Sequence, residues 1–196
     1  MGDSNLAFGI DSKLIEEEIG MPVVNMGLHG GLGNKFLEGC ALLNINEGDI
    51  LIVCHSNYSD NGKLGQTDLV WITLENHKEL WRIPDLQEWI ELLPALPDYA
   101  FNALSLYFSG RGNLREDACY AREAFNEYGD NVSERYPGTM EIDLKKVIVP
   151  TISDQCMERL NDMMKECQNK GAQMLIAGYP ILLNEAGEDK QAYIDF

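Results

Sequence analysis

The sequence predicts an α/β fold with a mostly parallel β-sheet, and three observations support that prediction. Two apolar stretches, residues 47–56 and 172–183, have the composition of strands that are buried on both faces of a sheet. Helical patterns alternate with these stretches at short spacing, as in β-α-β units. The chain has 196 residues, which suits a single domain, 1–196, with a substantial core.

Each expected element has local start and stop signals. Asp11 or Ser12 can cap the first helix, and Gly20 ends it. Gly171 gives the last helix a similar stop. In chain order we expect a helix over 10–20, a strand over 21–27, a helix over 34–45, a strand over 47–56, a helix over 154–170 and a strand over 172–183.

Residues 59–150 do not follow this alternation. The segment contains all three tryptophans and most of the tyrosines, and it includes turn-rich sequence near residue 60. We expect a largely helical insertion, with helices over 85–96 and 113–130. Insertions of this kind usually lie at one end of a sheet, where they can shape a pocket.

Composition excludes several classes of function. The net charge is −17, from 32 acidic and 15 basic residues, so nucleic acids and anionic membranes would be repelled over most of the surface. No apolar run approaches the ~20 residues that span a bilayer, and no signal peptide is visible. An anchor upstream of Met1 would leave membrane attachment open. The five cysteines have no C-x-x-C spacing, so we expect buried reduced thiols rather than a zinc site or disulfides.

The opening residues Gly-Asp-Ser place Ser4 on a turn before a helix. A serine acts as a nucleophile when a base takes its proton and fixed donors stabilise the oxyanion. Two further segments could supply donors: Gly27, where no Cβ obstructs the approach of a substrate to the backbone N–H, and the side-chain amide of Asn57. Both follow expected strands, and ligands of open parallel sheets bind at the carboxyl ends of strands. Ordinary turns use the same residue types.

These segments together resemble the SGNH (GDSL-type) hydrolase superfamily. The matching stretches are GDSNLAFG, NMGLHGGLG about twenty residues later, and a strand that ends in HSNY. The resemblance implies a flavodoxin-like three-layer α/β/α fold with Ser4 as nucleophile. It also implies an oxyanion hole made by the Ser4 and Gly27 amides and the Asn57 side chain.

The closest resemblance is to bacterial proteins of polysaccharide and cell-envelope gene clusters, in which FNEYGD (residues 125–130) is also familiar. It implies an enzyme that acts on acyl esters, for example acetyl esters, of a carbohydrate or envelope component. The enzyme would need no metal or organic cofactor, and its location would be the cell envelope or the cytoplasm.

The chain departs from the family in two places. The Asp-x-x-His block that carries the catalytic base is absent, and no strand precedes Ser4. We therefore expect a fragment truncated at both ends and, without that block, inactive or nearly so. His29 and His55 are the candidates for a substitute base, while Asp3 is expected to cap the helix or orient the loop. His77 is expected on a helix surface.

Three alternatives remain open at this point. A non-catalytic member could retain the fold as a binding or assembly module in polysaccharide biosynthesis or export. A phosphate or nucleotide site at residues 27–33 is less favoured, because the run lacks a lysine and the G-x-G-x-x-G spacing. Arg111, Arg115 and Arg122 could bind an acidic sugar or phosphate, although interleaved acidic residues favour a solvated ion-pair face.

Overall fold

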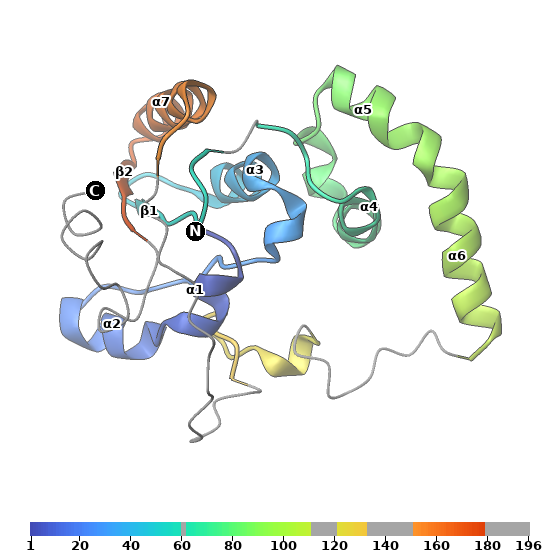
Figure 1. The fold of residues 1–196 in the computed structure, drawn as a ribbon. Helices are drawn as coiled ribbons and strands as arrows, with labels where there is room; N and C mark the ends of the chain where they lie inside the picture. Colours follow the sequence, from blue (N-terminus) through green and yellow to red (C-terminus); the bar gives the residue numbers. More distant parts are fainter. Residues whose placement is uncertain (60–61, 111–120, 133–150, 179–196) are drawn as a thin grey trace.

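The centre of the fold is a small parallel sheet (Figure 1). The computed structural model describes residues 1–59, 62–110, 121–132 and 151–178. Strand β1 (Ile50–Val53) pairs in parallel with β2 (Gln173–Ile176). Single parallel bridges continue the sheet beyond β1, from Cys54 to Gly2 and from Gly2 to Gly27. The spatial order is therefore residue 27, residue 2, β1 and β2, with the N-terminal segment in an interior position.

The two faces of β1 have different environments. Leu51 and Val53 are buried, whereas Ile50 and Ile52 are 42% and 48% exposed. Successive side chains of a strand point to opposite faces, so β1 buries one face in the core and leaves the other half-exposed. The β-branched residues of β1 suit such a half-buried position.

Helices α3 (Asn34–Asn44) and α7 (Asp154–Asn169) cover the buried face, while α1 (Ser4–Gly9) and α2 (Ser12–Ile19) lie on the other side of the strands (Figure 1). The Ser153 hydroxyl caps α7 by accepting from the amide of Cys156. Every buried side chain of α7 belongs to one stripe along the helix: Cys156, Leu160, Met163 and Cys167. That spacing of four, three and four residues places them on a single helix face against α3 and the sheet.

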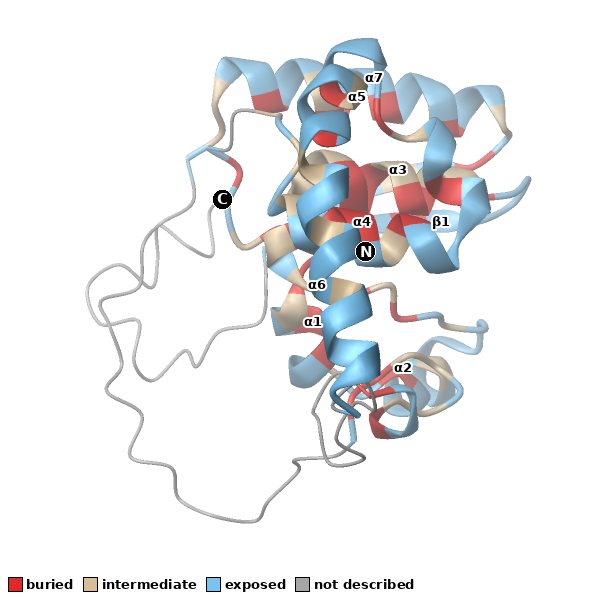
Figure 2. Cartoon of the chain, turned by 90° about the vertical axis from the view of Figure 1, so that its right-hand side faces the viewer, coloured by how far each residue is buried: buried red, intermediate tan, exposed pale blue. Residues whose placement is uncertain are grey.

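The expected insertion contains α4 (Thr67–Asn76), α5 (Leu86–Leu92) and α6 (Leu96–Phe108). Helix α4 joins the main core through Val70, Trp71 and Leu74. A capping box at Asp85 and Glu88 starts α5. Figure 2 shows α5 and α6 as mostly exposed helices on this side of the molecule.

The α/β class, the parallel pairing and most helix positions are confirmed. Two expectations were wrong in the described residues. Residues 21–26 form no strand: the bridge to Gly2 is confined to Gly27, and the Asn25 amide donates to the Tyr128 carbonyl instead of to a strand. The helix expected over 113–130 is absent from 121–130, where a 3-10 turn (Arg122–Ala124) and a turn with Gly129 at φ +90° replace it.

Within the described ranges, no helix combines the length and apolar character needed to cross a membrane. Cys40, Cys54, Cys156 and Cys167 are buried free thiols, as expected, and Cys119 lies outside the described residues. Burial raises the pKa of the Cys40 thiol to about 11.

Candidate functional site

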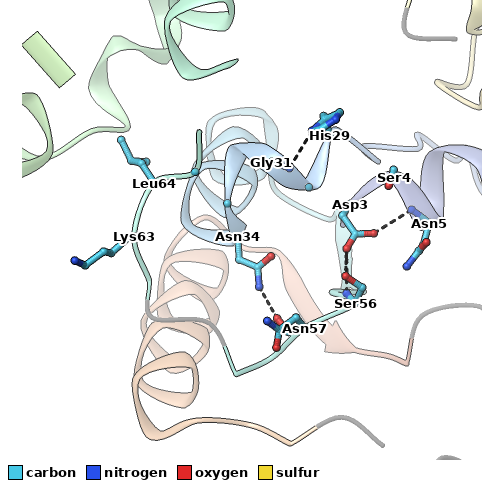
Figure 3. Close-up of a pocket in the computed structure, with 13 residues that line it drawn as sticks. Asp3, Ser4, Asn5, His29, Gly31, Asn34, Ser56, Asn57, Lys63 and Leu64 are labelled. Carbon is cyan, nitrogen blue, oxygen red and sulfur yellow. Dashed lines mark hydrogen bonds between the residues drawn. The ribbon is translucent and has the colours of Figure 1, made fainter. Parts of the chain in front are cut away.

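A pocket of about 570 Å³ lies where the segment that carries Ser4 meets the loops after residue 27 and after β1. Its wall is mostly polar, and Figure 3 shows Ser4, Asn57 and His29 around the same space. The lining residues are Asp3, Ser4, Asn5, His29, Gly30, Gly31, Gly33, Asn34, Ser56, Asn57, Lys63, Leu64 and Gly65. The prediction that Ser4 and Asn57 meet at one edge of the sheet is confirmed.

Ser4 occupies the first position of α1, and Asp3 is the cap of that helix. One carboxylate oxygen of Asp3 accepts from the Asn5 amide at 3.0 Å. The other accepts from the amide of Ser56 at 3.3 Å and from its hydroxyl. Asp3 therefore ties the Ser4 turn to the loop after β1, as expected of an orienting residue. In the described part of the chain the Ser4 hydroxyl and amide make no hydrogen bond.

Gly27 does not line the pocket, contrary to the expected oxyanion hole. Its amide donates to Asn25 Oδ1 at 2.9 Å, so it is not available to a substrate. A Cβ at this position would clash with the Ala7 amide nitrogen. The absence of a side chain at Gly27 thus permits close packing against α1, not the approach of a ligand.

Gly30 occupies the position that was expected of Gly27. It lines the pocket, and a Cβ added there would lie 3.3 Å from the Asp3 Cβ, which places its backbone beside the Ser4 turn. Its amide makes no hydrogen bond within the described residues. The sequence analysis assigned this role to Gly27 because it ends the expected strand, and it did not consider Gly30 in the run HGGLG that follows.

Asn57 lies across the pocket from Ser4. Its Oδ1 accepts from the Ser59 amide at 2.8 Å, and its own carbonyl accepts from Asn34 Nδ2 at 2.7 Å (Figure 3). These two bonds fix the turn and assign Nδ2 as the free end of the side chain, since no described residue accepts from it. Asn34, which the sequence analysis did not select, is thus a support of Asn57.

The buried side chain of Tyr58 holds the turn of residues 55–58 in place. Its buried hydroxyl accepts from the His55 amide at 3.2 Å and lies 3.1 Å from the Val53 carbonyl and 3.0 Å from the Ala177 carbonyl. The hydroxyl thereby connects the carboxyl ends of β1 and β2. A side chain between two strand ends restricts the movement of the pocket loop.

His29 is the histidine that lines the pocket. One of its ring nitrogens accepts a hydrogen bond from the backbone, which leaves the other nitrogen as a donor. Nδ1 accepts from the Gly31 amide at 2.9 Å and caps the 3-10 turn Gly30–Leu32. In the neutral ring the proton then lies on Nε2. To act as a base toward Ser4, the ring would first have to release the Gly31 amide.

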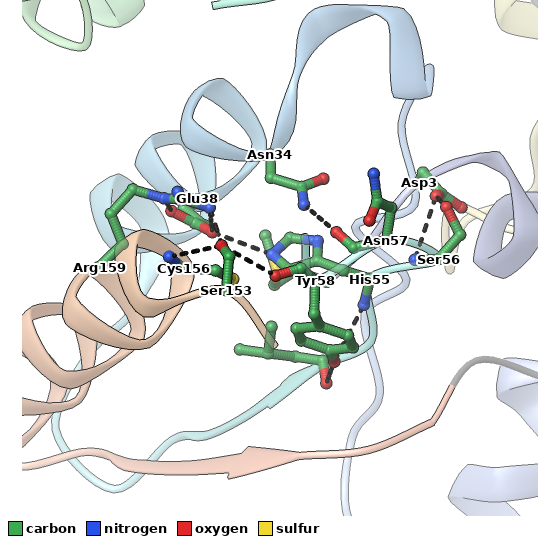
Figure 4. A network of polar contacts seen from close by, with 12 residues as sticks. Asp3, Asn34, Glu38, His55, Ser56, Asn57, Tyr58, Ser153, Cys156 and Arg159 are labelled. Carbon is green, nitrogen blue, oxygen red and sulfur yellow. Dashed lines mark hydrogen bonds and ion pairs between the residues drawn. The ribbon is translucent and has the colours of Figure 1, made fainter. Parts of the chain in front are cut away.

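His55 is fully buried and does not line the pocket, so the structure gives no support to it as a substitute base. Its Nε2 lies 3.0 Å from Glu38 Oε1, while Arg159 donates to the same carboxylate from Nε at 2.9 Å and from Nη2 at 3.2 Å (Figure 4). Burial raises the pKa of Glu38, but the hydrogen bonds with His55 and Arg159 outweigh it and hold the pKa below its ordinary value. The network supports the 55–58 turn.

A second buried network joins α2 and the segment before Gly27. Asp130, within the FNEYGD stretch, accepts from the Ser12 amide at 2.8 Å and hydroxyl at 2.6 Å, and from Asn25 Nδ2 at 2.8 Å. Asn25 Nδ2 also donates to the Leu6 carbonyl. Burial raises the pKa of Asp130, but these hydrogen bonds hold it below its ordinary value. Asp130 therefore links the start of α2 to Asn25, a role that sequence reasoning did not predict.

Other sequence candidates lie elsewhere. His77 is exposed at the end of α4, as expected. Arg122 is exposed and does not line the pocket, whereas Arg111 and Arg115 fall outside the described residues. In the described segments, no three His, Cys, Asp or Glu side chains are grouped so that they could bind a metal ion.

The site combines a serine hydroxyl with three N–H donors that have no partner in the described chain: the amides of Ser4 and Gly30 and the side chain of Asn57. Such donors stabilise negative charge on a carbonyl oxygen when they converge on it. Comparison with family models, curated proteins and solved structures found no match to this chain.

Proposed function

We propose that the chain carries the site of a serine ester hydrolase or acyltransferase of the SGNH type. Its substrates would be acyl esters, for example acetyl esters, of a carbohydrate or cell-envelope component. The observation that supports this most directly is the Ser4 hydroxyl in one pocket with the unpartnered donors of Ser4, Gly30 and Asn57. The order of residue 27, residue 2, β1 and β2 is consistent with a flavodoxin-like sheet.

In the proposed reaction the Ser4 oxygen attacks the acyl carbonyl. The carbonyl oxygen becomes an oxyanion that accepts from the Gly30 amide, the Ser4 amide and Asn57 Nδ2. The bond to the leaving alkoxide then breaks and an acyl-serine forms; water or a second hydroxyl regenerates Ser4. The proton of Ser4 passes to the leaving group through a base; among the described residues the candidate is His29, once its ring has released the Gly31 amide.

The pocket suits a substrate rich in hydroxyl groups. Asn5 and Asn34 add amide side chains to a wall that already contains Ser56 and Asn57, and amides can both donate to and accept from hydroxyls.

A non-catalytic binding module is the second candidate, and the histidines favour it. His29 Nδ1 is engaged by Gly31, and His55 is buried against Glu38, so neither ring is positioned to take the Ser4 proton in this conformation. An acyl-carbohydrate would then bind the same donors without being cleaved.

The test uses activated acetyl esters and a fluorophosphonate probe on the 196-residue chain, because an activated leaving group departs without protonation. We expect Ser4→Ala to abolish labelling and turnover, and Asn57→Ala to lower kcat by about 10²–10³-fold. Ser105→Ala and Asn102→Ala, both on exposed parts of α6, serve as matched controls and should leave the rate unchanged. Labelling that persists in Ser4→Ala would refute the assignment of the nucleophile.

One further variant separates the two candidates. His29→Asn keeps an acceptor for the Gly31 amide but removes the ring. If His29 is the base, kcat should fall by about 10²–10⁴-fold. The non-catalytic hypothesis instead predicts no labelling of Ser4, with calorimetric binding of an acetylated oligosaccharide that Asn57→Ala weakens.

A further inference from the structure

Helix α6 has two apolar faces, and among the described residues one of them packs against the rest of the fold. On the inner face, Tyr99 stacks on Trp71 of α4 with ring centroids 6.3 Å apart, and its hydroxyl donates to Glu75. On the outer face, Pro97, Phe101, Leu104 and Phe108 recur at spacings of four, three and four residues. We call these four residues the outer stripe. In Figure 2, α6 is exposed along its length.

The outer stripe is unusually exposed for its composition. Phe101 is 73% exposed, Leu104 56% and Phe108 81%, and the adjacent Tyr107 is 75% exposed. The rings of Tyr107 and Phe108 pack edge to face on each other, 5.6 Å apart. Contiguous apolar surface of this size on a folded protein marks an interaction site.

We propose that the outer stripe pairs with the same stripe of a second copy of the chain, in an antiparallel arrangement. A spacing of four, three and four residues is the pattern of a helix–helix seam, in which the side chains of one helix fill the gaps of the other. The antiparallel arrangement has two-fold symmetry, so each copy presents the identical surface to the other.

Helix α6 is a place where two copies can meet with little repulsion between like charges. The chain carries −17, so two copies repel each other over most of their surfaces. Among the thirteen residues of α6 only Asp98 is charged. Antiparallel pairing separates the two Asp98 residues by roughly 14 Å along the helix axis, which exceeds the Debye length of about 8 Å at physiological salt. A parallel pair would place them side by side.

The available area suits a weak, reversible dimer. Phe101, Leu104, Tyr107 and Phe108 together expose roughly 500 Å² on each copy, taking about 150–250 Å² for a whole aromatic side chain. Two copies would bury about 1,000 Å², near the lower limit of specific protein interfaces. Such an interface predicts an equilibrium between monomer and dimer that depends on concentration.

Sedimentation velocity on the 196-residue chain, from about 1 to about 100 µM, tests the proposal. We expect a reversible dimer, and we expect Leu104→Glu to raise its Kd at least about 30-fold, as for a central interface residue. Leu14→Glu on α2 is the matched control, because Leu14 is 55% exposed and the change in charge is the same. Phe101→Ser tests the stripe without added charge and should also weaken the dimer. Higher salt should strengthen it by screening the net charge.

Several results would overturn the proposal. These are a monomer at every concentration, a dimer that Leu104→Glu leaves intact while circular dichroism shows a native fold, or equal weakening by Leu14→Glu. A monomer that floats with phosphatidylcholine vesicles and loses this property in Leu104→Glu would assign the stripe to a lipid surface instead. A monomer whose α6 amides resist hydrogen exchange would indicate that another part of the same chain covers the stripe.

Discussion

Removing the Arg159 guanidinium tests how the buried Glu38 carboxylate supports the pocket. Glu38 has a side chain that is 7% exposed, and it receives two hydrogen bonds from Arg159 and one contact from His55. In Arg159→Met a similar volume remains, but the carboxylate loses its cation. Breaking a buried ion pair on one side costs about 3–5 kcal/mol, because the remaining charge is left without compensation. Arg159 is partly exposed, at 18% of its side chain, so we expect about 3 kcal/mol.

The double variant Glu38→Gln/Arg159→Met supplies the control. The amide oxygen of the introduced glutamine can still accept from His55 Nε2, while the charge that Arg159 balanced is gone. We therefore expect the double variant to recover most of the lost free energy of unfolding. Chemical denaturation followed by far-UV circular dichroism measures both variants. Equal destabilisation of the single and the double variant would refute the argument that an uncompensated charge is the cause.

The pH dependence gives an independent check. The folded pKa of Glu38 lies below its ordinary value near 4.5, so its ionisation stabilises the fold above that value and the contribution is lost as the pH falls through the folded pKa. In Arg159→Met, burial becomes the dominant influence and the pKa of Glu38 should rise. The difference in unfolding free energy between wild type and Arg159→Met should therefore shrink as the pH falls from the raised Glu38 pKa of the variant to the lowered Glu38 pKa of the wild type. A difference that is constant with pH would contradict this origin.

Two further substitutions test the supports of the pocket. Tyr58→Phe removes the hydroxyl that lies between the Val53 and Ala177 carbonyls. We expect the unfolding free energy, measured by urea denaturation, to fall by about 1–2 kcal/mol. An unchanged unfolding free energy would show that the hydroxyl does not hold the strand ends together. Gly27→Ala places a Cβ in steric conflict with the Ala7 amide. We expect the free energy of unfolding, measured by thermal denaturation, to fall by about 1–3 kcal/mol. A variant as stable as the wild type would contradict the close packing of Gly27 against α1.

Local sequence patterns determined much of the framework. The continuous apolar run over 47–56 predicted β1, and the acidic, capped pattern over 154–170 predicted α7 nearly to its ends. Their positions also predicted that Ser4 and Asn57 would meet, since parallel strands place their carboxyl ends at the same edge. These features follow from hydrophobic periodicity and capping, both of which act within a few residues of the chain.

The identity of the second amide in the pocket depended on tertiary contacts. Gly27 and Gly30 look equivalent in the sequence, but Asn25 binds the Gly27 amide and α1 packs against it, while Gly30 faces the pocket beside Asp3. The same holds for His55, which the sequence places next to Asn57 and the fold buries against Glu38.

The sequence by itself therefore determined the α/β class, the order of the main elements and the choice of Ser4 as the candidate nucleophile. The tertiary structure alone decided which donors of the pocket remain free, which histidine reaches it, and that Asp130, more than a hundred residues from Ser12, links α2 to Asn25. The physical reason is that a hydrogen bond to a buried group depends on what lies within about 3 Å of it. In a folded chain that neighbour can come from any part of the sequence.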